Sequence, residues 1–113
     1  KAKLAHTIGP DRLKHLIDKH LDEFNLIDVR KYEDYIKGHI PYAVHIPYDQ
    51  MEDQLVKLSK DKVNILYSYS FLCQLSQKAA YMLADKGYPV MEVIGWKKRD
   101  FDIVENDESD YPG

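Results

Sequence analysis

Apolar residues recur at helical spacing in two segments of the chain, and each pattern predicts an amphipathic helix. In residues 10–21, the side chains expected on one helix face are Leu13, Leu16, Ile17 and His20. In residues 49–58, they are Met51, Leu55 and Leu58. A longer helix is expected over about residues 73–86, which are rich in helix-forming residues and are followed by Gly87 as a C-cap. A short helix over residues 31–37 would end at Gly38 in the same way.

Short apolar runs lie between these segments, at residues 25–29, 44–46, 63–67 and 90–94. Each run has the length and character of a buried strand. Strands that alternate with helices predict an α/β fold with a central, mostly parallel sheet of four to five strands and helices on both faces. Ligands of such folds bind at the carboxyl ends of strands. The turn from Leu66 and Tyr67 into the helix at Cys73 is therefore the expected site.

Composition is that of an ordinary globular domain. The chain has 113 residues, of which 44% are hydrophobic and 31% are charged, and this length fits one domain. We expect a single domain over residues 1–113, with its core at about 8–104. The acidic end, residues 105–113, is expected to be a flexible tail.

Charge and cysteine content narrow the classes of partner. The net charge of −3 and the pI of about 5.9 argue against nucleic-acid binding, which needs a basic face. No apolar run approaches the roughly 20 residues that span a bilayer, so no membrane partner is expected. Cys73 is the only cysteine, so it has no internal disulfide partner, and no metal site is expected. A lone thiol is compatible with a reducing compartment, and we expect a cytoplasmic protein.

Three segments together resemble the rhodanese (sulfurtransferase) homology domain. The first runs from Leu26 to Arg30, includes Tyr35, and continues from Gly38 to Pro47, where the sequence GHIPYAVHIP is similar to the family's GHIPGA.NIP stretch. The second is residues 65–67 with residues 78–83, and the third is residues 86–95. The resemblance covers about residues 8–104 and implies the rhodanese-like fold.

The loop after the third predicted strand departs from the family's common form. In active single-domain members a cysteine directly follows the strand, and the loop ends with Arg and Ser. Here Ser68 stands in the cysteine's place, and no Arg or Lys lies between Ser68 and Gln77. A subset of the family has a second cysteine five residues later, which Cys73 matches. The family's second glycine near the end is Trp96 here, and its usual nearby Trp aligns with Asp100.

The resemblance implies that Cys73 is the catalytic residue and carries sulfane sulfur as a persulfide. The active-site loop would comprise Ser68, Tyr69, Ser70, Phe71 and Leu72. Such a reaction needs a thiolate and no cofactor. A helix N-terminus favours a thiolate, whereas apolar neighbours oppose it. The implied partners are a small sulfur donor and a thiol acceptor, and a protein acceptor of sulfur also fits.

Other interpretations are open for these residues. One is that the chain is a non-catalytic rhodanese-homology module that binds a partner or an anion. Another is that Cys73 is a core cysteine that packs its helix on the sheet. A phosphatase or arsenate reductase needs an Arg that closes the loop, which the sequence lacks. Asp28 and Arg30 end the first predicted strand and are expected to pair and to order the rim of the site. For His39 and His45 a structural role is favoured over a metal or acid–base role.

Overall fold

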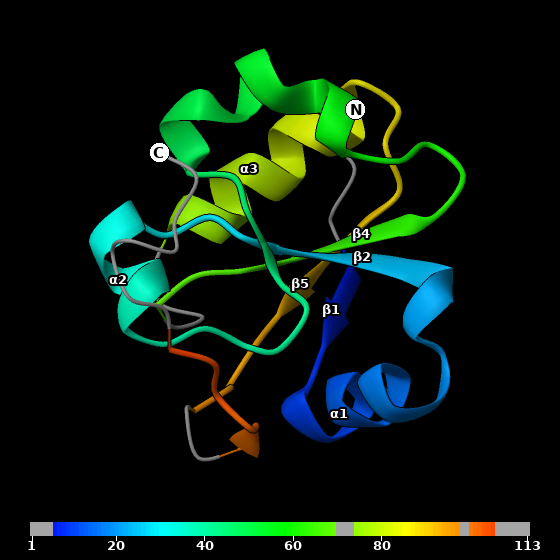
Figure 1. The fold of residues 1–113 in the computed structure, drawn as a ribbon. Coiled ribbons are helices and arrows are strands. Elements are labelled where there is room, and N and C mark those ends of the chain that lie inside the picture. The colour runs from blue at the N-terminus through cyan, green and yellow to red at the C-terminus, as the bar shows by residue number, and fades with distance from the viewer. Residues whose placement is uncertain (1–5, 70–73, 98–99, 106–113) are drawn as a thin grey trace.

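The computed structural model describes residues 6–69, 74–97 and 100–105 of the chain (Figure 1). Helices and strands alternate along it, as the apolar pattern predicts. In chain order the elements are β1 (His6–Ile8), α1 (Pro10–Lys19), the 3-10 helix η1 (Leu21–Glu23), β2 (Phe24–Asp28), α2 (Tyr32–Lys37), β3 (Val44–His45), the 3-10 helix η2 (Tyr48–Lys57), β4 (Val63–Tyr67), α3 (Gln74–Asp85) and β5 (Val90–Val93).

The strands form one five-stranded sheet in the order β1-β5-β4-β2-β3. Every pair of neighbouring strands in it is parallel. The α/β fold class and the parallel sheet expected from the sequence are therefore confirmed. β4 is the central strand and β2 lies beside it, and their register places Asp28 opposite Tyr67. The carboxyl ends of these two strands thus lie at the same edge of the sheet.

Each face of the sheet carries its own hydrophobic core. Successive residues of a strand point to opposite faces, so Leu26 and Ile65 pack in one core while Ile27 and Leu66 pack in the other. The first core includes Leu13 of α1, and the second includes residues of η2 and α3. Figure 1 shows α1 and α3 on opposite sides of the sheet. The prediction of helices on both faces is correct.

Glycine ends α3 as predicted. Gly87 has a φ of +90°, a left-handed conformation that favours glycine. Its N–H donates to the carbonyl oxygen of Ala84, and the N–H of Tyr88 donates to that of Leu83. These two bonds are the pair that defines a Schellman motif. They satisfy carbonyl groups that the end of the helix would otherwise leave unpaired.

Three elements differ from the expectation, and one of them is the short η1, which begins at the last residue of the helix expected over residues 10–21. η2 was expected to be an α-helix, but it is a 3-10 helix with a non-helical residue, Gln54, inside it. The spacing of Met51, Leu55 and Leu58 alternates four and three residues, which fits either kind of turn. β1 was not predicted, because its three residues are held by pairing with β5 and not by any local pattern.

Candidate active site

Three strands bring polar residues together at the carboxyl edge of the sheet. Asp28 ends β2, His45 ends β3 and Tyr67 ends β4. The strand registers pair Asp28 with both His45 and Tyr67. Because β2 lies between the other two strands, Asp28 is at the centre of this polar group. This edge is where a parallel α/β sheet places its ligand site.

Asp28 holds the buried guanidinium of Arg30. The Nε of Arg30 donates to Oδ1 and Oδ2 of Asp28 at 3.1 and 3.2 Å, and its Nη2 donates to Oδ2 at 2.9 Å. Nη2 also donates to the carbonyl oxygen of Gly38 at 2.6 Å. Burial by itself lowers the pKa of Arg30, but the hydrogen bonds and charge of Asp28 outweigh it and raise that pKa. Arg30 is therefore a permanent cation whose charge Asp28 balances.

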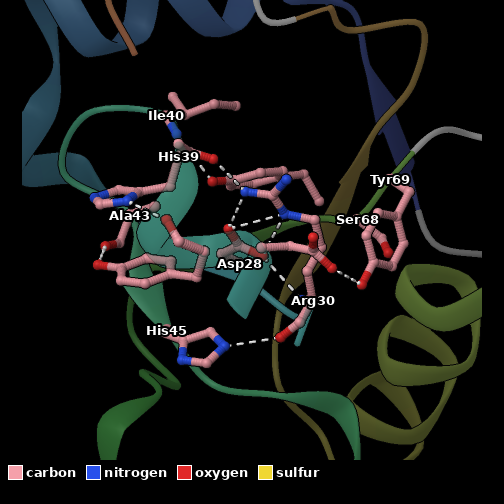
Figure 2. A network of polar contacts seen from close by, with 12 residues as sticks. Asp28, Arg30, His39, Ile40, Ala43, His45, Ser68 and Tyr69 are labelled. Carbon is pink, nitrogen blue, oxygen red and sulfur yellow. Dashed lines mark hydrogen bonds and ion pairs between the residues drawn. The ribbon is translucent and has the colours of Figure 1, made fainter. Parts of the chain in front are cut away.

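Aromatic rings surround the other sides of Arg30. Its guanidinium carbon lies 5.6, 5.9 and 5.7 Å from the ring centroids of Tyr67, Tyr69 and Trp96. These distances lie within the range of a cation–π contact. Figure 2 shows Arg30 between Asp28 and Tyr69. Arg30 is only 3% exposed, so it orders the floor of the site and offers little of its own surface to a ligand.

Tyr67 connects the end of β4 to the turn after α2. Its hydroxyl accepts a hydrogen bond from the backbone N–H of Ile40 at 2.9 Å. Its side chain is fully buried. Burial, followed by the nearby charge of Asp28, raises the pKa of Tyr67 far above that of a free phenol. Tyr67 is thus a neutral structural group.

The ring of Tyr35 lies between the two histidines singled out in the sequence. Its centroid is 3.8 Å from that of His39 and 4.6 Å from that of His45, and both pairs are stacked. His39 Nδ1 is 2.9 Å from the carbonyl oxygen of Tyr35, and His45 Nε2 is 2.7 Å from that of Arg30 (Figure 2). A carbonyl oxygen only accepts, so each of these nitrogens carries a proton. Burial lowers the pKa of His39 despite its bond to Tyr35.

The first two residues after β4 are anchored from different directions. Ser68 is buried, and its carbonyl oxygen accepts a hydrogen bond of 2.8 Å from Nε1 of Trp96. The hydroxyl of Tyr69 donates to Oδ2 of Asp34, in α2, at 2.5 Å. Partial burial and this carboxylate raise the pKa of Tyr69. The phenol is therefore protonated and a donor at neutral pH.

The loop residues predicted from the sequence fall into two groups. Ser68 and Tyr69 are described and lie at the carboxyl edge of the sheet with Asp28 and Arg30. Ser70, Phe71, Leu72 and Cys73 lie outside the described residues, as do residues 106–113 of the predicted tail. Cys73 directly precedes Gln74, with which α3 begins. The first turn of α3 is held to β5 by a bond of 2.9 Å from the Ser76 hydroxyl to Glu92.

A cavity of about 430 Å³ opens beside this edge of the sheet. It extends between the start of α2, the start of η2 and Leu75 of α3. Its other lining residues are Val29, Arg30, Lys31, Tyr32, Glu33, Pro47, Tyr48, Asp49 and Gln50. The lining combines both signs of charge with apolar surface. The cavity is of a size suited to a small molecule.

Within the described part of the chain, no group of His, Asp and Glu side chains gathers in a way that could hold a metal ion. In the same residues, every helix is too short or too polar to cross a bilayer.

Sequence reasoning missed three contributors to the site: Tyr35, Asp34 and Trp96. Trp96 is the only tryptophan, and a lone tryptophan at an irregular position is a usable signal for a buried anchor. Tyr35 lies within the first segment that resembles the family, but the sequence assigned no role to it. Asp34 gave no signal, because an acidic residue in the first turn of a short helix is normal whatever it binds.

Comparison with known proteins agrees with this architecture. Residues 9–96 match the sequence profile of the rhodanese-like domain. The BH2092 protein of Bacillus halodurans, whose crystal structure is known, superposes with a TM-score of 0.82 at 33% identity, over 89% of this chain and 77% of that one.

Two relatives bear names of different kinds. "Putative sulfurtransferase YtwF" of Bacillus subtilis is 32% identical over 77 residues, which is 66% of this chain and 70% of that protein. "HTH-type transcriptional regulator Rv0324" of Mycobacterium tuberculosis is 35% identical over 68 residues, which is 60% of this chain but only 30% of the regulator. The family profile, the relatives and the shared parallel sheet show that this chain belongs to the rhodanese-like domain family.

Proposed function

We propose that this chain is a rhodanese-like sulfurtransferase that carries sulfane sulfur as a persulfide on Cys73. Membership of the family and the likeness to a relative named as a sulfurtransferase support a role in sulfur transfer. The observation that carries the proposal is the position of the only thiol. Residues 68–73 connect the end of β4 to the start of α3, and Cys73 is the last of them.

The reaction proceeds in two exchanges at sulfur. The Cys73 thiolate attacks the sulfane sulfur of the donor, so that a new S–S bond forms at Cys73 while the donor's S–S bond breaks and its remaining part leaves as an anion. An acceptor thiolate then attacks the terminal sulfur, and Cys73 leaves as a thiolate. No external oxidant or reductant is consumed. The first step needs Cys73 in its thiolate form, and the second is favoured when Cys73 is a good thiolate leaving group.

The start of α3 supports that form of the thiol. The first N–H groups of a helix have no partner within it, and the helix dipole places partial positive charge there. This effect is worth about 0.3–1 kcal/mol for an exposed anion. A helix terminus therefore aids the reaction modestly, and other groups near the thiol have to supply the rest.

A second function has its own support in the sequence. Ser68 stands where active relatives have a cysteine, and residues 68–77 contain no Arg or Lys. A non-catalytic module that binds a partner or an anion at the same edge of the sheet would tolerate both features. Such a module would not retain sulfur on Cys73.

Intact-mass spectrometry after incubation with polysulfide separates the two functions. The sulfurtransferase gains the mass of one sulfur atom and loses it again when a small thiol is added. The Cys73→Ser variant, which keeps the size of the side chain, is the control and gains nothing. A wild-type mass that does not change under these conditions would rule out the sulfurtransferase and favour the binding module.

A further inference from the structure

Separate segments of the chain form the walls of the cavity beside the carboxyl edge of the sheet. Residues 31–33 lie at the start of α2, and residues 47–50 lie at the start of η2. Leu75, in the first turn of α3, lines a further side. Figure 1 shows α2 and the start of α3 at this edge. The volume of about 430 Å³ suits a small organic molecule.

Hydrogen bonds fix the backbone of two of these walls. The N–H of Tyr48 donates to the carbonyl oxygen of Val29 at 3.2 Å, which ties the start of η2 to the residue after β2. The N–H groups of Asp34 and Tyr35 donate to the carbonyl oxygen of Lys31 at 3.1 and 3.0 Å, which fixes the first turn of α2. A preformed cavity loses less conformational entropy on binding than one that must be assembled around its ligand.

Exposed side chains of both charges line this cavity. Lys31 and Glu33 belong to the α2 wall, and Asp49 belongs to the η2 wall. In the part of the chain that the structure describes, none of these three side chains takes part in an ion pair. The charge of Arg30, by contrast, is balanced by Asp28. The lining therefore presents a cation and two carboxylates that are open to a ligand.

The same cavity has an apolar lining. Val29, Pro47 and Leu75 contribute aliphatic groups, and Tyr32 and Tyr48 contribute aromatic rings. Tyr48 and Leu75 also pack against the second hydrophobic core, which supports them. An aliphatic group that contacts these side chains leaves water, and this favours binding.

We propose that this cavity binds a small zwitterion of the amino-acid type, with an ammonium group, a carboxylate and an aliphatic side chain. Lys31 pairs with the carboxylate, and Glu33 and Asp49 pair with the ammonium group. A simple anion would be repelled by the two carboxylates of the lining, and a simple cation by Lys31. A ligand with both charges gives each of these side chains a partner. The inference goes beyond the proposed function, because it concerns binding alone and needs no transfer of sulfur.

Isothermal titration calorimetry with L-leucine and three derivatives of the same shape tests the match of charges. Leucinamide lacks the carboxylate, 2-hydroxy-4-methylpentanoate lacks the ammonium group, and 2-hydroxy-4-methylpentanamide lacks both. We expect leucine to bind, and each singly charged derivative to bind roughly three- to tenfold more weakly, the change that loss of one charged contact at a partly exposed site produces. The uncharged derivative should bind most weakly of the four.

Variants without these charges test the role of each side chain. Lys31→Gln should weaken the binding of leucine and of the hydroxy acid by a similar factor, without weakening that of leucinamide. Glu33→Gln combined with Asp49→Asn should weaken leucine and leucinamide, without weakening the hydroxy acid. Lys14→Gln and Asp18→Asn, at exposed positions on α1, are the matched controls and should leave every affinity unchanged. Because all of these positions are exposed, the melting temperatures should stay close to that of the wild type.

Three results would overturn the inference. One is the absence of any heat of binding with leucine at millimolar concentration. Another is a singly charged derivative that binds the wild type as tightly as leucine does. The third is an affinity for leucine that is unchanged both in Lys31→Gln and in the Glu33→Gln/Asp49→Asn double variant, because leucine would then bind elsewhere. None of these measurements depends on sulfur uptake by Cys73, so the proposed function and this inference can each fail without the other.

Discussion

Asp28 and Arg30 form an ion pair that is almost completely removed from solvent, with side chains 0% and 4% exposed. The two residues are separated by only one position, so the pair closes a tight turn directly after β2. The backbone N–H of Arg30 also donates to Oδ1 of Asp28 at 2.9 Å. A charge in such a place is tolerated because its partner balances it.

Replacement of one partner of this ion pair should therefore lower the free energy of unfolding far more than a substitution at an ordinary surface position does. We expect Asp28→Asn to lower the free energy of unfolding by about 3–5 kcal/mol, because the Arg30 charge is then buried without a counterion. Urea unfolding followed by circular dichroism measures this. Adding Arg30→Met to Asp28→Asn should cost less than the sum of the single changes. Strictly additive losses would show that the two charges do not depend on each other.

Gly87 tests the cap of α3. Its φ of +90° disfavours any residue with a Cβ, while the space around an added Cβ is empty. The cost of Gly87→Val is thus one of backbone strain alone, and we expect a loss of about 1–2 kcal/mol. Gly87→Asn should cost less, because asparagine adopts the left-handed conformation more readily. Equal melting temperatures for wild type and Gly87→Val would contradict this account of the cap.

Tyr42 has a left-handed backbone conformation at a position where glycine would be less strained. It has a φ of +71° although it is not glycine, and it occupies the position where the family's GHIPGA stretch has glycine. Its side chain is 65% exposed, so little packing is lost when it is removed. We expect Tyr42→Gly to raise the free energy of unfolding by roughly 0.5–1 kcal/mol, the relief of strain less the entropy of a new glycine. Tyr42→Phe, which keeps the strain, should have no effect. A less stable Tyr42→Gly would mean that the tyrosine makes contacts that outweigh its strain.

His39 makes stability depend on pH. Its pKa is lowered from the ordinary 6.5, chiefly by burial. The folded protein then binds fewer protons than the unfolded chain in acid, so the contribution of His39 is complete above about pH 6.5 and is lost as the pH falls through its folded pKa. The urea midpoint of the wild type should decrease over that window. His39→Asn keeps a donor for the Tyr35 carbonyl oxygen and should flatten the slope. An unchanged slope in His39→Asn would place the pH dependence elsewhere.

Most of the fold could be predicted from the sequence, because the strands are continuous apolar runs and the helices have clear ends, such as Gly87. Less of the candidate site could be predicted in this way. Asp28 and Arg30 were expected to pair, and they do, but the burial of Arg30 depends on rings from two separate segments, which no local pattern reveals. The same holds for the bond between Asp34 and Tyr69, residues far apart in the sequence. Non-local contacts of this kind are set by the packing of the finished sheet.

The charge of a sulfur donor should decide how fast it loads Cys73. Thiosulfate is a dianion and needs a cation beside the loop, yet residues 68–77 contain none. Arg30 does not substitute for it, because Asp28 balances its charge and it is 3% exposed. We therefore expect thiosulfate to load Cys73 much more slowly than an alkyl persulfide does, as measured by the rate at which intact mass increases.

Gln77 allows this charge argument to be tested in both directions. It is exposed and lies in the first turn of α3, directly before the exposed Lys78. Gln77→Arg should raise the rate with thiosulfate and leave the rate with an uncharged alkyl persulfide unchanged, whereas Gln77→Glu should lower the thiosulfate rate further. Ser68→Cys should raise activity if the two-cysteine members of the family are the right comparison. Rapid turnover of thiosulfate by the wild type would contradict the argument, because the donor would then be held without a cation in the loop.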